Sequence, residues 1–396
     1  MKAVGIIAEY NPLHTGHLFH MQEARRLSGA DGVIVVMSGS FVQRGEPALV
    51  DKYRRARMAL AAGADLVLEL PPAAALGSAQ RFAEGAVNSL LATGTVSHLA
   101  FGAETADISL LTQAAELTQT DAWQDALREC LRKGTAYPAA AAEASAVLCG
   151  GQRGAAAPNN TLAIEYLKAL RKAGSSMVPV AVARRGEGYG SLHIGGDYIS
   201  AAAVREQLLS GSDAWKPYVP QEMHALLDYA MTADDFSFPL AAKLLRMGRD
   251  EMTEYEDVSD DLAGRIAAAA PYACSFTELA AGIQTRSFSL ARIRRALLHI
   301  LLDMKKQPEG PSVTCLKVLG LREGSPLLKE VKKKASVPLI TKTADAAPGL
   351  ADSFRLTADL YNLAVLHRWN IKLPDDYRKG PERYSAPCGM TDPVIK

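Results

Sequence analysis

The hydrophobic and polar positions of the first 210 residues alternate between short apolar runs and longer amphipathic stretches. Apolar runs with strand composition lie at residues 4–8, 32–37, 65–70, 98–101 and 178–183. Helical spacing lies between them, at residues 15–27, 52–62, 80–92 and 158–174. Short runs that are apolar throughout are typical of strands buried on both faces of a parallel sheet. The alternation therefore predicts an α/β fold with a parallel sheet and right-handed crossovers.

Helical patterning also fills residues 107–146, with breaks near Gly134 and Pro138. The alanine- and glycine-rich segment 139–157 is compatible both with a helix and with a mobile loop. Pro158 to Thr161 have the composition of a helix start, because Asn is a preferred N-cap residue. Ser200 is expected to cap a further helix that carries Arg205 within its first two turns.

The strand signal largely disappears beyond about residue 212, where helical stretches separated by Pro and Gly dominate. We therefore expect two domains, an α/β domain over 1–210 and a mainly α-helical region over 211–396. The clearest element of the second is a helix over residues 290–301. Leu290, Ile293 and Leu297 follow helical spacing and should face a core, whereas Arg292, Arg295 and His299 fall together on another face.

Composition is that of a globular, multidomain protein. The chain has 396 residues, of which 48% are hydrophobic and 22% charged. Its five cysteines are scattered, which argues against a disulfide framework or a structural zinc site, and we expect no metal centre. No apolar run is long enough to span a bilayer and no cleavable leader is evident, so we expect a cytoplasmic protein without a membrane partner. The oligomeric state cannot be read from the sequence.

Positive charge is concentrated in one window. The net charge is +1, yet residues 286–342 contain 13 Lys and Arg against 4 Asp and Glu. A solvated helix face and an RNA-binding surface both fit this excess. The candidate RNA-binding residues are Arg292, Arg295, His299, Lys332 and Lys333.

The strongest candidate for chemistry follows the first apolar run. Asn11-Pro12 favours a turn, and His14-Thr15-Gly16-His17 (the tetrad) then opens a helix. A helix start offers unpaired N–H groups and the positive end of the macrodipole to a phosphate, and Gly16 allows close approach. Two imidazoles can donate hydrogen bonds to phosphate oxygens during nucleotidyl transfer. A metal site and an ordinary polar helix start are the alternatives.

Other polar segments lie where strands of the predicted sheet end, the edge at which open α/β sheets bind ligands. They are the long polar turn 38–47, Gly102, Asn160 at a helix start, and the arginines Arg184 and Arg205. Arginine suits bidentate phosphate contact. No carboxylate pair, Ser-His-Asp arrangement or activated cysteine stands out. The inferred chemistry therefore needs no protein nucleophile, and attack on the α-phosphate of ATP by an external oxyanion fits donors alone.

The motifs GIIAEYNPLHTGH, SGSFVQRGEPA, GADLVLELP, FGAE, PNNTLAIEYLKAL and SAAAVR, in this order, resemble the tRNA(Met) cytidine acetate ligase family. That family belongs to the H-x-G-H nucleotidyltransferase-like superfamily. The resemblance is close over residues 1–210 and looser over the basic helical region. It implies a Rossmann-like (HUP-type) nucleotidyltransferase domain, followed by a helical domain that binds tRNA.

The resemblance also implies a carbon–nitrogen bond-forming ligase. Such an enzyme activates acetate with ATP as acetyl-adenylate, releasing pyrophosphate, and acetylates N4 of the wobble cytidine of elongator tRNA(Met). Its cofactor-like substrates would be ATP and acetate; the sequence does not reveal whether Mg²⁺ is required.

By the same resemblance, His14, His17 and Arg205 are the candidate catalytic residues. The implied ATP site comprises Ile7, Ala8, Glu9, Tyr10, Asn11, Pro12, Leu13, His14, Thr15, Gly16, His17, Leu18, Phe19, His20, Gly102, Asn160 and the pair Arg184 and Arg185. The chain departs from the family at Ala202, where relatives usually carry Thr, and so lacks the hydroxyl that would contact a phosphate there.

Two other functions remain open at this point. One is an adenylate-forming or nucleotidyl-transferring enzyme of the same superfamily with another acceptor, which would not need the basic helical half. The other is a non-catalytic protein that binds ATP and RNA. The intact tetrad argues against the second, because a degenerate site would be expected to lose a histidine.

Overall fold

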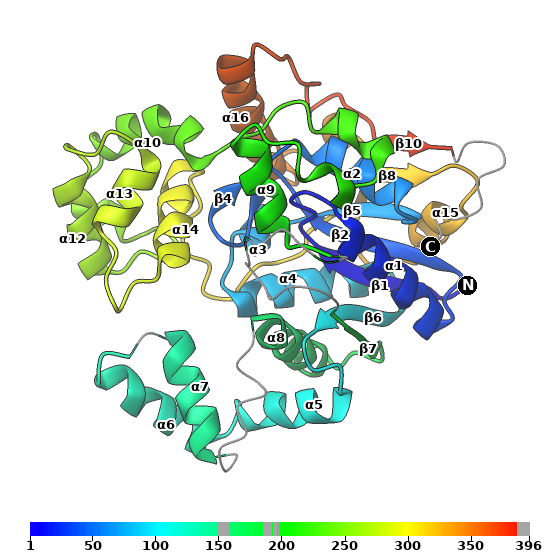
Figure 1. Cartoon of the computed structure of the whole chain (residues 1–396), viewed down its shortest axis with the longest axis horizontal. Helices are drawn as coiled ribbons and strands as arrows, with labels where there is room; N and C mark the ends of the chain where they lie inside the picture. Colours follow the sequence, from blue (N-terminus) through cyan, green and yellow to red (C-terminus); the bar gives the residue numbers. More distant parts are fainter. Residues whose placement is uncertain (136, 149–157, 185–191, 193–195, 197, 386–396) are drawn as a thin grey trace.

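The computed structural model describes residues 1–135, 137–148, 158–184, 192, 196 and 198–385, and its centre is one sheet (Figure 1). The strand order is β10-β8-β5-β2-β1-β6-β7, with β9 paired to β8. Five neighbouring strands are parallel, namely β5 (Leu66–Leu70), β2 (Gly32–Ser38), β1 (Ala3–Ala8), β6 (Val96–Ala103) and β7 (Val178–Ala183). The predicted parallel α/β sheet is confirmed, and each predicted strand lies within about two residues of its expected bounds.

Helices cover both faces of this sheet, which explains why its strands are apolar throughout. Val33 and Val35 of β2 face one core with α1 (Thr15–Ser28) and α2 (Lys52–Ala61). Ile34 and Val36 face the opposite core with α4 (Ala79–Ala92) and α8 (Pro158–Lys172). Successive side chains of a strand point to opposite faces, so both sets are buried.

A short hairpin occupies the polar turn after β2, where no strand was predicted. It consists of β3 (Phe41–Val42) and β4 (Glu46–Pro47), which pair antiparallel. Gly45 at its tip has φ +74°, and a Cβ there would lie 2.4 Å from the backbone nitrogen of Arg295. The hairpin is therefore seated directly on the backbone of α14 (Leu290–Leu301).

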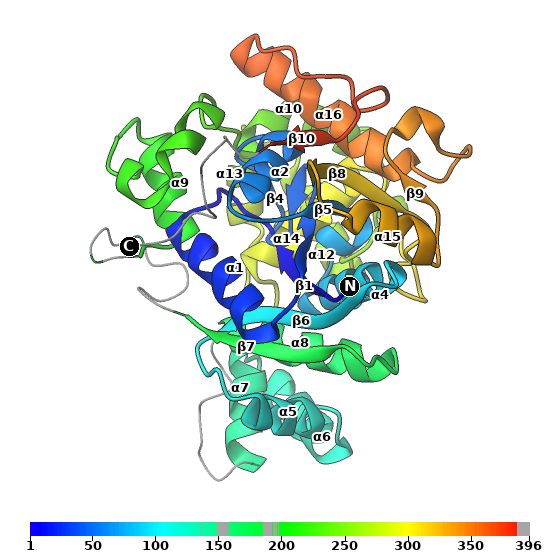
Figure 2. The ribbon, with the colours of Figure 1, turned by 90° about the vertical axis from the view of Figure 1, so that its right-hand side faces the viewer.

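The predicted helical segment 107–146 forms a small unit with its own core. It contains α5 (Ile108–Leu117), α6 (Asp121–Arg132) and α7 (Tyr137–Leu148). Trp123 and Leu127 pack against α7 in this core. Figures 1 and 2 show the unit below α8 and β7. Of the segment 139–157, residues up to 148 are helical and 149–157 lie outside the described residues.

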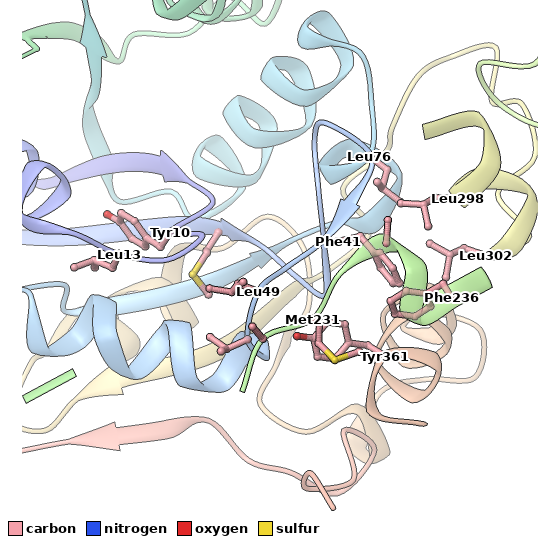
Figure 3. Packing of buried hydrophobic residues seen from close by; sticks show 14 of the residues in the cluster. Tyr10, Leu13, Phe41, Leu49, Leu76, Met231, Phe236, Leu298, Leu302 and Tyr361 are labelled. Carbon is pink, nitrogen blue, oxygen red and sulfur yellow. The ribbon is translucent and has the colours of Figure 1, made fainter. Parts of the chain in front are cut away.

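The region after residue 211 is mainly helical as far as α14. The helices over residues 237–301 form a group beside β4 in Figure 1, and Phe236, Leu298 and Leu302 at this group pack against Phe41 of the hairpin (Figure 3). The helix α9 (Ala201–Leu209) precedes this region. The further helices within and after it are η1 (Lys216–Tyr218), η2 (Gln221–Leu226), η3 (Ala233–Phe236), α10 (Ser237–Leu244), α11 (Arg249–Met252), α12 (Asp260–Ala269), α13 (Phe276–Gly282), η4 (Thr343–Asp345) and α16 (Asp352–Trp369).

Among the described residues, three strands nevertheless follow residue 212, and the expectation that strands largely end there is wrong for them. β8 (Leu316–Arg322) pairs antiparallel with β5, and β10 (Glu382–Tyr384) and β9 (Leu339–Ile340) pair with β8. Lys317 and Gly320 interrupt the apolar pattern of β8. Both are explained by packing, since Lys317 is paired internally and a Cβ at Gly320 would lie 2.8 Å from Leu60.

Lys317 belongs to a buried set of two cations and two anions, Lys52, Glu69, Lys317 and Asp376, here named the four-charge cluster. The Lys52 ammonium lies 2.9 Å from Glu69 and 2.8 Å from Asp376. Lys317 donates to Asp376 and lies 3.5 Å from Glu69. All four side chains are at most 3% exposed. The cluster joins α2, β5, β8 and the segment after α16.

The described residues include no helix with the length and apolar character that a bilayer crossing needs.

Candidate active site

A cavity of about 280 Å³ opens at the carboxyl ends of β1, β6 and β7. It lies where the parallel strands end and α1 begins, the edge predicted to bind the ligand. Of the predicted ATP stretch, the residues that line it are Ile7, Ala8, Glu9, Tyr10, Asn11, His14, Gly16, His17, Phe19 and His20. Pro12, Leu13, Thr15 and Leu18 do not line it; Leu13 and Leu18 belong to the core instead.

The tetrad caps α1 with its own imidazoles. The Gly16 N–H donates to Nδ1 of His14 over 3.0 Å, and the His14 N–H donates to Nδ1 of His17 over 3.3 Å. This is a reciprocal capping arrangement in which two orphan backbone donors are satisfied by side chains. The two rings lie 3.9 Å apart between centroids. The helix start thus holds both histidines in one orientation.

Both tetrad histidines are neutral, and their tautomer follows from the cap. Burial, followed by the charges of Arg184 and Arg205, lowers the pKa of His14 to about 3. Burial and then the neighbouring His14 and His20 hold the pKa of His17 well below its usual range. Because each Nδ1 accepts a backbone proton, the ring proton of each neutral imidazole is on Nε2. Each ring therefore has one N–H donor for a ligand.

His20, one turn further along α1, presents a hydrogen-bond acceptor rather than a donor. Its ring donates to the backbone of Phe101, and burial first, then Arg184, lower its pKa to about 4 despite that bond. Its Nε2 is buried and has no hydrogen-bond partner among the described residues. A neutral ring that donates through one nitrogen accepts through the other. The site therefore combines two imidazole donors with one imidazole acceptor.

The β6–β7 side of the cavity carries Gly102 and Arg184. A Cβ at Gly102 would meet Arg184 at 3.5 Å and His20 at 3.8 Å, which are ordinary contacts. The protein itself therefore does not require glycine there, in keeping with a role in leaving room for a ligand. The charge of Arg184 reaches all three histidines, whose pKa values it helps to lower. Arg185, the other predicted arginine, lies outside the described residues.

Arg205 extends from α9 into the same cavity. Ser200 caps α9 by accepting from the Ala203 N–H over 3.0 Å, as predicted from the sequence. Arg205 donates to the backbone carbonyl of Asn11 over 2.7 Å. The guanidinium therefore fixes the turn before the tetrad while it lines the cavity.

Asn160 is not placed as the sequence suggested. The helix α8 begins at Pro158, so Asn160 lies in its first turn rather than at its cap. Its side chain accepts from the Thr105 N–H over 3.1 Å and donates to the Thr105 hydroxyl over 3.2 Å. It is 1% exposed and is not among the cavity-lining residues. In this structure Asn160 orders the turn after β6.

The polar turn 38–47 lines the cavity opposite β6 and β7, as the strand-end argument predicted. Its hairpin contributes Val42, Gln43, Arg44 and Glu46. A fully buried arginine, Arg55 of α2, fixes the root of the turn by donating to four backbone carbonyls, those of Glu9, Ser38, Gly39 and Val50.

Sequence reasoning missed the apolar walls of the cavity. Phe82, Leu162, Tyr166 and Tyr198 line it from α4, α8 and the segment before α9. Apolar residues at helical spacing look like ordinary core positions, and no signal in a single sequence distinguishes cavity-lining residues from core residues. Tyr10 was within the predicted stretch, and its hydroxyl is buried with no hydrogen-bond partner among the described residues.

The predicted RNA-binding residues on α14 are only partly accessible. Arg295 is 8% exposed and its Nε donates to Asp257 over 2.7 Å. His299 is 1% exposed and hydrogen-bonds the carbonyls of Glu256 and Leu76. The expected basic face of this helix is thus directed into the protein for these two residues. Arg292 is half-buried, beside Phe288.

Lys332 and Lys333 are exposed, but they lie at the edge of the sheet where the parallel strands begin, opposite the cavity. They lie at the end of α15 (Leu327–Lys334), and a Cβ at Gly94, in the turn before β6, would meet the Lys334 carbonyl oxygen at 2.5 Å. Figures 1 and 2 show α15 near the N-terminus, where β1 starts. The structure therefore does not bring Lys332 and Lys333 together with Arg292 or with the cavity.

The described residues form no group of three or more His, Cys, Asp or Glu side chains that could hold a metal ion.

Comparison with known proteins identifies relatives along almost the whole chain. The family HIGH Nucleotidyl Transferase matches residues 1–372. A tRNA(Met) cytidine acetate ligase of Caldanaerobacter subterraneus subsp. tengcongensis is 40% identical over 91% of this chain and 94% of its own length. One from Acetivibrio thermocellus is 37% identical over 87% of this chain and 89% of its own.

Two solved structures share the fold. Thermotoga maritima TmcAL bound with alpha-thio ATP superimposes with a TM-score of 0.86 at 28% identity, covering 98% of this chain and 100% of that one. The apo form of the same protein gives a TM-score of 0.88 with the same identity and coverage. The similarity therefore extends across both halves of the chain.

Proposed function

Because the chain belongs to the HIGH Nucleotidyl Transferase family and, within it, to the tRNA(Met) cytidine acetate ligases, we propose that it makes acetyl-adenylate from acetate and ATP. Pyrophosphate leaves in this step, and the acetyl group then passes to N4 of the wobble cytidine of elongator tRNA(Met). At the coarser level the protein is a ligase that uses ATP to acetylate a cytidine of tRNA(Met).

The observation that carries the proposal is the state of the tetrad. Both Nδ1 atoms are occupied by backbone N–H groups, so both rings line the cavity as neutral donors through Nε2. Attack of acetate on the α-phosphate brings two anions together and develops charge on the phosphate oxygens. Preorganised donors at a helix N-terminus stabilise that charge without an acid–base step. His14 and His17 fit this role.

The remaining predicted residues divide by chemistry. Arg184 and Arg205 supply fixed positive charge beside the histidines, which suits the triphosphate and its leaving group. Gly102 and the acceptor nitrogen of His20 suit the nucleoside, whose hydroxyl or amino groups can donate to it. Asn160 acts indirectly by ordering the turn next to Gly102. The binding of acetate in this cavity, and of any Mg²⁺ that accompanies the triphosphate, is part of the same proposal.

The apolar walls protect the intermediate. Acetyl-adenylate is a mixed anhydride that water hydrolyses, and Phe82, Tyr166 and Tyr198 keep much of the cavity surface apolar. The cytidine must leave its stack to reach such a site, as substrates of base-modifying enzymes do. We place the main tRNA contacts beside the hairpin and α14, with Arg292, and only secondary contacts at Lys332 and Lys333.

The proposal is tested with labelled acetate, ATP and either elongator tRNA(Met) or no RNA. We expect acetate-dependent exchange of pyrophosphate into ATP without RNA, and label in tRNA only when it is added. An adenylating enzyme with another acceptor would give the exchange but leave the tRNA unlabelled. A protein that merely binds ATP and RNA would give neither, and that outcome would refute the proposal.

A further inference from the structure

Glu9 stands apart from the rest of the predicted ATP stretch. It is the only carboxylate between Ile7 and His20, and it lines the cavity with the tetrad. A carboxylate there repels the phosphates of ATP rather than binding them. Its presence in a cavity that otherwise supplies donors calls for a separate role.

The side chain of Glu9 is held in place by the hairpin. The Gln43 N–H donates to its Oε1 over 2.9 Å, and its backbone carbonyl accepts from Arg55 over 2.8 Å. Among the described residues, no hydrogen bond or ion pair is made to its second oxygen, Oε2. Glu9 is thus a positioned acceptor with one lone-pair edge available to a ligand.

Glu9 also separates two sides of the cavity. The strand order places β6 and β7, with Gly102 and Arg184, on one side of β1, and β2 with its hairpin on the other. The predicted nucleotide contacts belong to the first side. The hairpin side carries Arg44 and Glu46 and lies next to Phe82, and its outer surface packs on α14. This second side, here named the hairpin flank, adjoins the region to which we assign tRNA binding.

The chemistry of the hairpin flank matches a cytosine. Carboxylates are the side chains that accept from the N4 amino group of cytosine. Phe82 and Arg44 line the same cavity and would offer such a base apolar surface and a cation. The adenylate is expected on the side of β6 and β7. An amine bound at the hairpin flank would lie across Glu9 from it.

Resting on the proposed function, we propose that the hairpin flank receives the cytosine and that Glu9 accepts the proton that its N4 amine loses. N4 attacks the carbonyl carbon of acetyl-adenylate and the C–N bond forms. The bond from that carbon to the phosphate oxygen breaks, and AMP leaves with the electron pair. One N4 proton passes to the Glu9 carboxylate, so the amide is neutral and the step balances.

The groups around Glu9 suit this role. Burial raises its pKa, the Gln43 N–H and the charges of Arg205 and Arg44 lower it, and Glu46 raises it. The Arg55 guanidinium adds a further cation behind its backbone. A carboxylate whose pKa is raised is a stronger base once it is ionised.

The test isolates the second half of the reaction. Prepared acetyl-adenylate is mixed with excess protein and tRNA(Met) without ATP, and the single-turnover rate of acetyl transfer is followed from pH 5 to 9. The wild-type rate should rise with pH and level off once Glu9 is ionised. The Glu9→Gln variant keeps the acceptor for the Gln43 N–H but no base; we expect its rate to fall about 100-fold or more and to lose that inflection.

Glu46→Gln is the matched control, since it removes a carboxylate from the same flank. Its profile should keep the inflection and move it to lower pH, because Glu46 raises the pKa of Glu9. If Glu9→Gln keeps the wild-type rate, or slows without losing the inflection, Glu9 is not the base and the leaving phosphate takes the proton. Loss of acetate-dependent exchange in the wild type would refute the proposed function instead, so the two failures are distinguishable.

Discussion

The cavity histidines and the four-charge cluster show two ways of burying ionisable groups at the same edge of one sheet. In the four-charge cluster, Lys52 contacts both carboxylates and Lys317 donates to Asp376. Tyr53 adds a hydrogen bond to Asp376 over 2.9 Å. Each of the four charges has a partner of opposite sign within the cluster.

The three histidines follow the opposite arrangement. His14, His17 and His20 are neutral rather than paired, and each uses one ring nitrogen on the backbone. The other nitrogen is left to the cavity. Buried polar groups whose partners all lie within the protein stabilise the fold. Buried polar groups that keep one donor or acceptor without a protein partner can bind a ligand. Substitutions in the four-charge cluster should therefore mainly lower stability, and substitutions of the cavity histidines should mainly lower activity.

The largest effect is expected from Lys317→Met. It leaves Glu69 and Asp376 to share Lys52 in a buried site, and removing one partner of such a network typically costs about 3–5 kcal/mol. Urea unfolding measures the change in the free energy of unfolding. Adding Asp376→Leu restores charge balance and should recover part of the loss. A cost below about 1 kcal/mol for Lys317→Met would show that the cluster does not hold the C-terminal segment.

His17→Ala should affect activity instead. Removing one donor to a developing oxyanion costs about 10²- to 10³-fold in rate, and we expect this loss in acetate-dependent pyrophosphate exchange. The free energy of unfolding should fall by only about 1 kcal/mol, since a capping contact is lost. His98→Ala, in β6 and not among the cavity-lining residues, is the control. Equal losses in both variants would contradict the assignment.

Stability should also depend on pH through the histidines. The pKa values of His14 and His20 are lowered to about 3 and about 4, against an unfolded value of about 6.5. Between these values the unfolded chain binds more protons, so stability falls as the pH drops from about 6.5 toward 4. Each histidine contributes up to about 1.4 kcal/mol per pH unit. In unfolding measured from pH 7 to 5, His20→Gln should show a shallower loss than wild type; an identical slope would mean that His20 is protonated in the fold.

The smallest effects are expected at the half-buried Arg292 and the exposed Lys332 and Lys333. Arg292→Ala should lower the slope of log affinity for tRNA against log salt by about one, as for a single phosphate contact. Arg292→Lys should retain that contact. Lys332→Ala with Lys333→Ala should change the slope less, because these residues lie at the opposite edge of the sheet. A larger change for the lysine pair would place the tRNA across α15.

Much of the first half of the fold could be predicted from the sequence because its signals are local. Val33 to Met37 are apolar on both faces, and the tetrad marks a strand-to-helix turn by itself. Ser200 has the residue type of a helix cap and is one. β8 could not be found in this way, because Lys317 is stabilised by Asp376, a partner 59 residues away.

The site was predictable to the extent that its residues are polar and follow strands. His14, His17, Gly102, Arg184 and Arg205 all line the cavity. The expected exposure of Arg295 and His299 was wrong. Helical spacing shows which side chains share a face of the helix, but it does not show which face packs against the rest of the protein. Asp257, which pairs with Arg295, lies on a separate segment whose position only the tertiary fold determines.

The antiparallel pairing of β8 with β5 limits how this protein can be truncated. A fragment ending at residue 210 would leave the backbone N–H and carbonyl groups of β5 on that side without the ladder that β8 supplies. Leu66 and Leu68, fully buried in the intact chain, would lie at a bare edge, and such edges recruit other chains into aggregates. A shortened chain built on residues 1–210 should therefore retain residues 316–322, for example through a circularly permuted or split-and-reassembled chain.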